Sequence, residues 1–321
     1  MKKIALITSG GDAPGMNAAI RAIVKTCLHY NIVPFGIYDG YQGMMEGRGK
    51  QLNYSDVDNI IQYGGTILGS ARAKEFFHFE GRQMAINFLK ENNIDGLIVI
   101  GGDGTFAGAH LLGQEMKIPI IGIPGTIDND IFGTDYTIGF DTAINTVIGA
   151  VDKIRDTASS HHRVFFVEVM GRDSGFIALA SAVASGAESV LVPEETTDIQ
   201  ELVDNIKNQG KHSSIILVAE GDDAGHAVDI MNKVKPYLKE YELRLSVLGH
   251  IQRGGSPTAK DRIVATQMGN SAVELLRENK TNLTIGIKGS KLQNCPISVA
   301  IKQHSEPDLA FLKLIEVLRT K

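Results

Sequence analysis

The chain has 321 residues, of which 43% are hydrophobic and 21% are charged, and its formal net charge at pH 7 is −5. This length predicts about two domains, each with enough residues for a core. The acidic balance and the absence of tryptophan argue against a nucleic-acid binder, which would carry a basic excess and stacking aromatic side chains. Small anionic substrates fit this composition, because they need only a few local arginines.

The cysteines and the apolar runs indicate in which cellular compartment the protein is expected. Cys27 and Cys295 fit no metal or redox spacing, so we expect reduced, packed residues of a cytosolic protein. The first apolar run, residues 4–7, is too short for a secretion signal, and no run approaches the roughly 18 apolar residues of a membrane span. We therefore expect a soluble cytoplasmic protein with no membrane partner.

Apolar strand-like runs alternate with helical periodicity along most of the chain, which predicts βαβ units and a parallel sheet. The run 4–7 leads into a glycine turn at 10–15, and a helix should follow, because apolar residues from Ile20 to Leu28 recur at helical spacing. Pro14 suits the start of that helix. The further strand candidates are 33–37, 97–100, 120–123, 164–169, 215–218 and 244–248, and a last helix should begin near Asp308.

Two turns combine glycines with carboxylates just after strand candidates. One is Gly-Gly-Asp-Gly-Thr at 101–105, and the other is Pro-Gly-Thr-Ile-Asp-Asn-Asp at 124–130. Open parallel sheets bind ligands where their strands end. Glycines there let the backbone approach a phosphate, and carboxylates there can hold a metal or accept a proton. These turns predict a ligand site.

The turn at 101–105 has three candidate interpretations. A dinucleotide fingerprint fails, because Gly102, Gly104 and Gly108 have the wrong spacing, and the chain contains no Walker sequence. A phosphate turn fits, with the backbone N–H groups of residues 102–105 facing phosphate oxygens and Asp103 on the metal side. A structural turn without a ligand remains the alternative.

Asp128 and Asp130 are the acid–base candidates. In an extended segment, two residues at this spacing point to the same side. Two close carboxylates would share a Mg²⁺ ion, or one would have a raised pKa that favours proton uptake. The alternative is a solvated turn in which aspartate caps the backbone.

Five arginines lie next to predicted strand ends. Guanidinium groups bind phosphate bidentately, although each arginine taken alone is more simply a surface charge. As a set they favour an anionic ligand; they are Arg72, Arg163, Arg172, Arg244 and Arg253.

The motifs resemble those of the bacterial-type ATP-dependent 6-phosphofructokinases, nearly end to end. The matching segments are 8–18, 101–105, 124–130, 169–172 and 248–257, all in order. The turn at 101–105 is the least specific, because NAD kinases and lipid kinases share it. The resemblance implies two Rossmann-like three-layer α/β/α domains with largely parallel sheets and an active site in the interdomain cleft. Residues 1–139 with 252–303 would bind ATP, and 140–251 with 304–321 would bind fructose 6-phosphate.

The resemblance also implies the reaction, which is a step of glycolysis. The γ-phosphoryl group of MgATP would pass to the 1-hydroxyl of fructose 6-phosphate, giving fructose 1,6-bisphosphate and ADP. Asp128 would be the base. The other implied catalytic residues are Thr126, Asp130, Arg72, Arg172 and Gly11. The implied ATP-binding residues are Gly11, Arg72, Ala73, Gly102, Asp103, Gly104, Thr105 and Gly108, with Asp103 toward Mg²⁺.

For the sugar phosphate, the resemblance implies that the 6-phosphate is bound by Arg163, Arg244, His250 and Arg253. Arg163 and Arg244 would come from a neighbouring subunit of a homotetramer. The remaining implied substrate residues are Thr126, Ile127, Asp128, Met170, Gly171, Arg172, Glu220, Ile251 and Gln252.

Donor choice and regulation follow from single positions. Pyrophosphate-using relatives carry Asp at position 104 and Lys at 125. This chain has glycine at both positions, which should leave open space for the α-phosphate of ATP, so we expect ATP as the phosphoryl donor. An effector site for ADP or phosphoenolpyruvate is implied at Arg21, Lys25, Arg155, Gly186, Glu188, Lys211 and Ser213. Because Lys25 replaces an arginine, and Tyr54, Asn59 and Gln209 replace charged residues, we expect weakened or altered control.

Two other functions stay open at this stage. One is a kinase for another sugar phosphate. The other is a catalytically inactive sugar-phosphate sensor, against which the presence of both Asp103 and Asp128 argues.

Overall fold

The computed structural model describes residues 1–158, 163–208 and 213–319. The chain forms two compact units, the first from Met1–Ile127, Ile131–Thr142 and Arg253–Ser305, and the second from Asp128–Asp130, Ala143–Gln252 and Glu306–Lys321. Each unit is built around one sheet with mostly parallel strands. The predicted α/β class is therefore confirmed. The chain passes between the units several times, which explains why the sequence contains no visible linker.

The sheet of the first unit has its most buried strands at its centre. Its strand order is β12-β11-β5-β4-β1-β2-β3, with β6 paired to β5. The edge strands β12 and β3 run antiparallel to their neighbours, and the pairs between them are parallel. The strand bounds are β1 Lys3–Thr8, β2 Val33–Ile37, β3 Gly49–Gln51, β4 Gly96–Gly101, β5 Ile120–Thr126, β6 Ile138–Gly139, β11 Leu283–Lys288 and β12 Lys291–Pro296.

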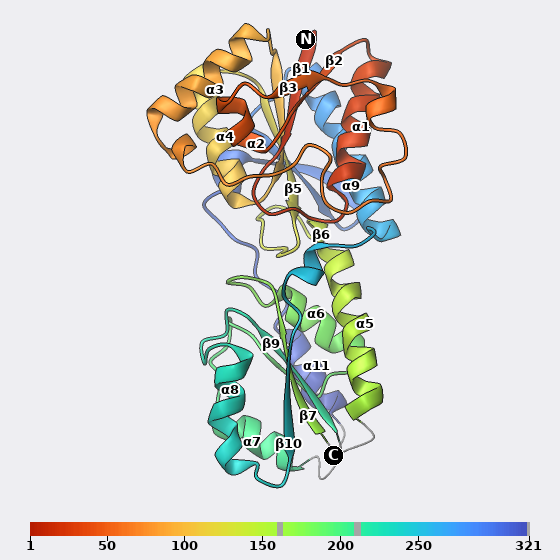
Figure 1. Cartoon of the computed structure of the whole chain (residues 1–321), viewed down its shortest axis with the longest axis vertical. Coiled ribbons are helices and arrows are strands. Elements are labelled where there is room, and N and C mark those ends of the chain that lie inside the picture. The colour runs from red at the N-terminus through yellow and green to blue at the C-terminus, as the bar shows by residue number, and fades with distance from the viewer. Residues whose placement is uncertain (159–162, 209–212, 320–321) are drawn as a thin grey trace. The chain divides into compact units, whose positions relative to one another are not determined.

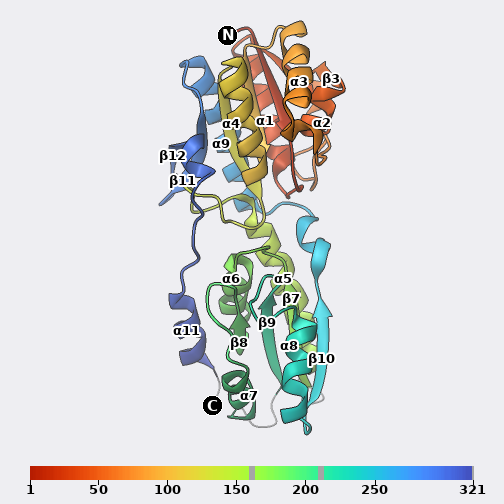
Figure 2. The same cartoon turned by 90° about the vertical axis from the view of Figure 1, so that its left-hand side faces the viewer.

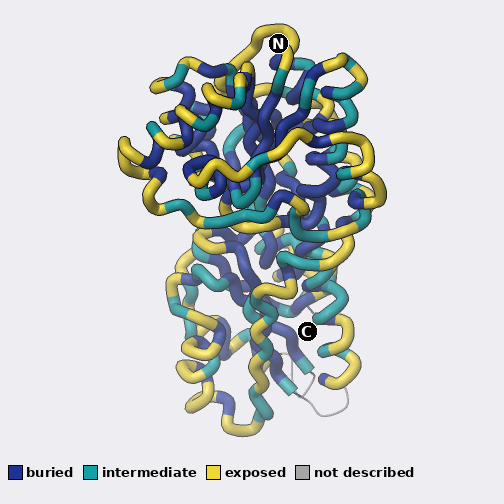
Figure 3. Tube along the Cα trace, turned by 45° about the horizontal axis from the view of Figure 1, so that its top comes forward, coloured by how far each residue is buried: buried dark blue, intermediate teal, exposed yellow. Residues whose placement is uncertain are grey.

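Helices cover both faces of this sheet (Figure 1). Helices α1 (Met16–His29) and α9 (Ala259–Arg277) pack together on one face. Helices α2 (Gly40–Met45), α3 (Phe79–Glu91) and α4 (Asp103–Met116) enclose a core on the other face. Short helical segments are η1 (Tyr54–Asp56), η2 (Glu75–Phe77) and α10 (Ile297–Ala300). The buried trace of the central strands is continuous in Figure 3, as expected for strands covered on both faces.

The connections in this sheet create a ligand-binding position. Strand β1 leads into α1 on one face, whereas its neighbour β4 leads into α4 on the opposite face. The strand order therefore reverses between β1 and β4. In open α/β sheets, ligands bind at the carboxyl ends of the strands at such a switch point.

The second unit has a four-stranded parallel sheet in the order β10-β7-β9-β8. Helices α7 and α8 enclose a core on one face, and α6 and α11 lie on the other (Figures 1 and 2). The bounds are α5 Phe140–Ala158, β7 Arg163–Val169, α6 Phe176–Ser185, β8 Ser189–Leu191, α7 Ile199–Asn208, β9 Ser214–Ala219, α8 Ala227–Val234, η3 Lys235–Tyr237, β10 Glu242–Val247, η4 Gly249–Arg253 and α11 Ala310–Leu318. Strand β10 begins two residues before the predicted start at 244.

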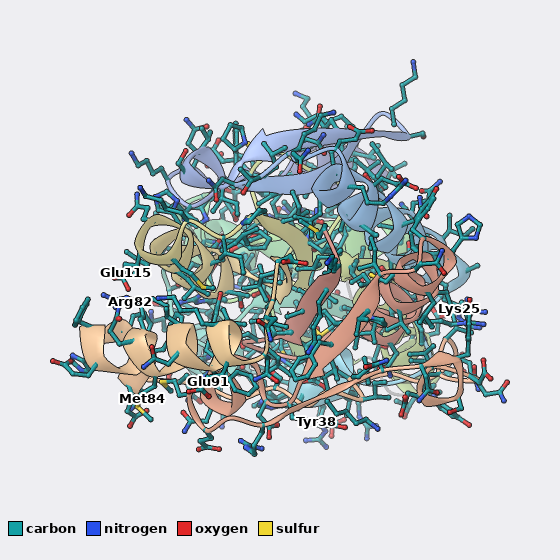
Figure 4. All side chains as sticks on the ribbon, turned by 90° about the horizontal axis from the view of Figure 1, so that it is seen from above. Lys25, Tyr38, Arg82, Met84, Glu91 and Glu115 are labelled. Carbon is teal, nitrogen blue, oxygen red and sulfur yellow. The ribbon has the colours of Figure 1, made fainter. Side chains whose placement is uncertain are left out.

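A half-buried ion pair joins α3 and α4 in the first unit. The Arg82 Nε donates to Glu115 Oε1 at 2.8 Å, and Figure 4 shows these side chains pointing toward each other. The Arg82 Nη1 also donates to the carbonyls of Phe76 and Phe77 in η2. This arginine therefore fixes the segment that follows Arg72 and Ala73.

A buried carboxylate organises the first turn of α5. Asp261 on α9 is 2% exposed, and it accepts hydrogen bonds from the backbone N–H groups of Gly139 and Thr142 and from the Thr142 hydroxyl. Burial raises the pKa of this carboxyl. Because its oxygens satisfy donors at a helix start, Asp261 is the local capping group.

Replacing Asp261 by Ala should leave those donors unsatisfied in a buried place. We expect the free energy of unfolding to fall by about 2–4 kcal/mol, measured as a lower midpoint of thermal or urea unfolding. The control is Asp58→Ala, because the Asp58 side chain is 55% exposed. An unchanged midpoint for Asp261→Ala would contradict the capping role.

Candidate active site

Turns that follow β1 and β4 meet at one edge of the first unit's sheet. The Ser9 N–H donates to the carbonyl of Ile100 at 3.1 Å, and the Thr105 hydroxyl donates to the carbonyl of Ser9 at 3.0 Å. Gly101 at the end of β4 is in register with Pro124 on β5. The two glycine- and carboxylate-bearing turns therefore follow the neighbouring strands β4 and β5, and the first of them lies at the switch point between β1 and β4.

The turn at 101–105 forms the start of α4. Gly102 is the N-cap residue, with an extended backbone, and Asp103 opens the helix. The Thr105 N–H donates to the carbonyl of Gly102 within this first turn, and its contact with a phosphate stays a prediction. Gly104 is exposed, and apart from its chain neighbours and the backbone of its own helix, no atom of the described residues lies within 4 Å of the position where a Cβ would stand. The helix start is therefore open to an anion at Gly102 and Gly104.

Gly125 differs from Gly104. A Cβ at Gly125 would stand 2.9 Å from Cγ2 of Ile100 and 3.1 Å from Cε of Met16. The prediction of open space at both glycines is therefore wrong at Gly125, because core side chains fill that position. A lysine there would require the core to shift.

Gly108 serves packing within the first unit. A Cβ at this buried position would stand 2.9 Å from the ring of Tyr41. Tyr41 stacks on Phe76 at a centroid distance of 4.1 Å and donates its hydroxyl proton to the Thr105 carbonyl at 2.6 Å. The absence of a side chain at Gly108 thus leaves room for the Tyr41 ring, whose hydroxyl stabilises the turn through the Thr105 carbonyl. Contact of Gly108 with a nucleotide stays a prediction.

Asp103 and His304 lie together beside this turn. Asp103 Oδ2 is 3.5 Å from His304 Nδ1, and the Asp103 side chain is 23% exposed. A carboxylate oxygen is a ligand type that Mg²⁺ prefers, and the open face of Gly104 leaves space beside it. The residues present therefore fit a Mg²⁺ ion. Sequence reasoning missed His304, because no local motif connects it with Asp103.

Arg253 lies against the turn that follows β1. A Cβ at Gly11 would overlap the Arg253 guanidinium, so only glycine allows this approach. Among the described residues, no hydrogen-bond partner is found for the Arg253 Nε. A residue expected at the sugar phosphate thus packs on a residue expected at ATP.

The segment 126–130 continues from β5 with a sharp change of direction. Thr126, Asp128 and Asp130 are half-buried, whereas Asn129 is buried and has a left-handed backbone with φ 59°. The expectation of an extended segment is therefore wrong at Asn129, whereas the expectation that both aspartates point to one side stays a prediction. Asparagine tolerates the left-handed region better than most residues do, so Asn129 sets the relative direction of the two carboxylates. Ile127 between them is buried.

In the second unit, four predicted substrate residues are brought together at the carboxyl edge of the sheet. The Arg172 N–H donates to Glu220 Oε1 at 2.8 Å, and the Met170 N–H donates to Gln252 Oε1 at 3.2 Å. These residues follow β7, β9 and β10, which are neighbours in the sheet. Gly171 lies between two of them, and a Cβ there would overlap the Ser174 carbonyl. This edge therefore forms a hydrogen-bonded cluster.

Arg163 and Arg244 lie at the opposite end of the same sheet. Arg163 is the first residue of β7, and Arg244 is near the start of β10, which runs parallel to it. At about 3.3 Å per residue, the length of β7 separates Arg163 from Met170 by about 23 Å. Both arginines are paired with Glu242. One copy of this unit therefore does not bring all the predicted substrate residues together.

The remaining predicted active-site residues are solvent-accessible. His250 and Ile251 are exposed on η4, which follows β10. Arg72 is exposed and Ala73 is half-buried in the segment before η2. These positions leave their side chains accessible to ligands, and their roles stay predictions.

The predicted effector residues fall into two groups. In the second unit, Arg155 binds Glu188 at 2.8 Å and the Gly186 carbonyl at 2.7 Å, with Ser213 just before β9. A shallow pocket adjoins them, lined by Ala182, Val183, Gly186, Ala187, Glu188, Ile315, Leu318 and Arg319. Lys211 and Gln209 lie outside the described residues.

The other group lies in the first unit. Arg21 and Lys25 are half-buried on α1, and Lys25 pairs with Asp58 at 3.5 Å. The Lys25 ammonium also lies 5.9 Å from the Tyr54 ring, and Asn59 has a left-handed backbone. Lys25 is therefore already engaged by its neighbours.

The fold and the turns define an α/β protein with a helix start that is open to solvent at the switch point of a mostly parallel sheet. Residues 3–276 match the family model described as phosphofructokinase. The chain belongs to the phosphofructokinase family.

Curated relatives cover almost the whole chain. A protein named ATP-dependent 6-phosphofructokinase 2 from Bacteroides thetaiotaomicron is 52% identical over 94% of each chain. A protein named ATP-dependent 6-phosphofructokinase 1 from Thermus thermophilus is 50% identical over 99% of each chain. The family resemblance derived from the motifs is therefore confirmed.

Solved structures share the fold. Phosphofructokinase from Saccharomyces cerevisiae matches with a TM-score of 0.89 at 35% identity, and this chain spans about half of that chain. A pyrophosphate-dependent phosphofructokinase from Marinobacter aquaeolei matches with a TM-score of 0.85 at 20% identity over 98% of this chain and 91% of that one. None of the described helices has the length and apolar character of a membrane span.

Proposed function

We propose that this protein is an ATP-dependent 6-phosphofructokinase, which transfers the γ-phosphoryl group of MgATP to the 1-hydroxyl of fructose 6-phosphate. The observation that carries the proposal is the open turn at 101–105, with Asp103 at the start of α4, at the switch point between β1 and β4. The names of relatives at 50–52% identity support the same reaction. Glycolysis and a cytoplasmic location belong to the proposal, the latter supported by two buried free thiols.

Asp128 accepts the proton of the 1-hydroxyl while that oxygen forms a bond to the γ-phosphorus. The bond between this phosphorus and the β,γ-bridging oxygen breaks, and ADP leaves. Thr126, Asp130, Arg72 and Arg172 hold the transferring group, because phosphoryl transfer is catalysed mainly by positioning and charge stabilisation. Mg²⁺, held on the Asp103 side, neutralises charge on the nucleotide phosphates when it is bound.

The sugar phosphate is bound by two sets of residues. Met170, Gly171, Arg172 and Glu220 surround the sugar, and His250 and Arg253 bind the 6-phosphate. Arg163 and Arg244 of a neighbouring subunit complete the phosphate site, and the separation of Arg163 from Met170 within one chain, about 23 Å along β7, supports this assignment. The edge strand β10 exposes Leu245 and Val247, which supports an association of subunits, here a homotetramer.

Effector control is part of the same proposal. ADP or phosphoenolpyruvate binds near Arg155, Gly186 and Glu188, together with Arg21 and Lys25 of another subunit. Control is weakened because Lys25 cannot form the bidentate contact of an arginine.

A coupled assay of ADP formation tests the function. The protein with MgATP should phosphorylate fructose 6-phosphate at least tenfold more efficiently, by kcat/KM, than other ketose or aldose phosphates. A higher kcat/KM for another sugar phosphate would replace the proposed acceptor. No phosphorylation of any sugar phosphate would favour a sensor.

Replacing Gly104 by Asp should weaken ATP binding. A carboxylate at this open position would stand beside the nucleotide phosphates, and the like charges repel by roughly 1 kcal/mol in a solvated site. We expect the KM for ATP to rise about fivefold, with a smaller change in the KM for fructose 6-phosphate. Gly104→Ser is the neutral control, and an equal rise in both variants would contradict the charge argument.

A further inference from the structure

Two arginines and one glutamate form an ion-pair cluster at the amino end of the second unit's sheet. Glu242 Oε2 accepts a hydrogen bond from the Arg163 Nε at 2.7 Å, and Glu242 Oε1 accepts one from the Arg244 Nη2. Glu242 and Arg163 are register partners on β10 and β7. Arg244 lies two residues after Glu242, and residues at this spacing in a strand share a face. The three side chains therefore lie side by side.

The pairing leaves most of each guanidinium unused. Each carboxylate oxygen binds a different arginine and takes one of its nitrogens. Among the residues that the structure describes, the other nitrogens of Arg163 and Arg244 have no hydrogen-bond partner. The side chains of Arg163 and Arg244 are 21% and 49% exposed. These remaining donors can therefore reach an anion from solvent.

The carboxylate keeps its charge under ordinary conditions. The hydrogen bond and charge of Arg163, and also the charge and hydrogen bond of Arg244, hold the pKa of Glu242 below its usual range. A charged Glu242 orients two long side chains before a ligand arrives. The ligand then binds without the entropic cost of ordering them. Its charge also repels an incoming anion, so the net effect of Glu242 on phosphate binding depends on whether orientation or repulsion is larger.

We propose that Glu242 is a positioning residue that holds Arg163 and Arg244 as a preformed fork for one phosphate monoester, the 6-phosphate of the sugar bound in a neighbouring subunit. This inference rests on the proposed function, in which both arginines bind that phosphate. Glu242 does not touch the phosphate and acts through the two arginines. Orientation outweighs repulsion, because the carboxylate uses only one nitrogen of each guanidinium.

Glu242→Gln tests this role with a side chain of the same shape. Its amide nitrogen would face an arginine donor, so the fork loses one of its two contacts and the charge of the other. We expect the KM for fructose 6-phosphate to rise about tenfold, with kcat and the KM for ATP within twofold of the parental values. Glu242→Asp, which keeps the charge on a shorter stem, should give a smaller rise.

Glu240→Gln is the matched control, because Glu240 is exposed two residues earlier and the change in net charge is the same. It should leave all three parameters unchanged. An unchanged KM for the sugar phosphate in Glu242→Gln would overturn the proposal. A lowered KM would also overturn it, because Glu242 would then compete with the phosphate for the two arginines. A tenfold rise in Glu240→Gln as well would also overturn it.

Combining Glu242→Gln with Arg163→Ala separates positioning from a general structural effect. If Glu242 acts through Arg163, its effect on the KM should shrink to about threefold or less in the Arg163→Ala background, since neighbours in one network are not additive. An undiminished tenfold effect would overturn the proposal. If Arg163→Ala and Arg244→Ala both leave the KM unchanged, the proposed binding of phosphate fails too. If the two alanine variants raise the KM for fructose 6-phosphate and Glu242→Gln does not, only the positioning role of Glu242 fails.

Discussion

Replacing Asp128 by Asn should lower kcat by a factor of about 10²–10⁴, the usual contribution of a general base. The amide keeps the size of the side chain but cannot accept the proton of the attacking hydroxyl. The KM for fructose 6-phosphate should change little, because the proton transfer occurs in the transition state. Steady-state kinetics with ATP and fructose 6-phosphate measure both quantities.

Asp135→Asn is the control for this variant. Asp135 is an exposed carboxylate a few residues further along the same connection, where it accepts the N–H of Gly289. Its replacement should leave kcat within twofold of the parental value. Near-normal turnover in Asp128→Asn would remove Asp128 from the role of base and would direct attention to Asp130.

The local parts of this fold could be predicted from the sequence. The runs 97–100 and 120–123 became the buried strands β4 and β5, and helical spacing from Ile20 to Leu28 marked α1 correctly. These features follow from hydrophobic periodicity, which neighbouring residues carry among themselves. The order of the strands and the switch point needed the structure, because they depend on pairing between distant segments.

The site was predictable where a motif is local and not where distant segments meet. The turn at 101–105 was recognised, but no sequence signal places His304 beside Asp103 or Arg253 over Gly11. The left-handed Asn129 also escaped prediction, because alternation along an extended strand was assumed for 126–130. Glu242 had a weak signal, since a carboxylate two residues before Arg244 shares its face in a strand.

Replacing Arg163 by Ala should raise the KM for fructose 6-phosphate by about 10–100-fold and leave kcat nearly unchanged. A charge-assisted contact to phosphate contributes about 1.5–3 kcal/mol. The 6-phosphate does not react, so the contact is equally strong in the ground state and the transition state. Initial rates over a wide range of sugar phosphate give the two parameters. A lowered kcat with an unchanged KM would contradict the binding role.

Hybrid oligomers test whether Arg163 acts in the site of a neighbouring subunit. Within one chain, Arg163 lies at the opposite end of the sheet from Met170 and Glu220, so a shared site needs two copies. When Arg163→Ala and Asp128→Asn chains are refolded together, some sites receive Asp128 from one chain and Arg163 from the other. These sites are intact, and activity at low fructose 6-phosphate should exceed that of either variant alone. The control is a mixture of Asp128→Asn and Arg72→Ala chains. Arg72 is expected to act in the site of its own chain, as Asp128 does. Every chain in this mixture then has a defective site, so the activity should not exceed that of the separate variants. If the mixture of Arg163→Ala and Asp128→Asn chains gains no activity, Arg163 does not act in a neighbouring subunit's site. Arg253 and His250 would then bind the phosphate without it.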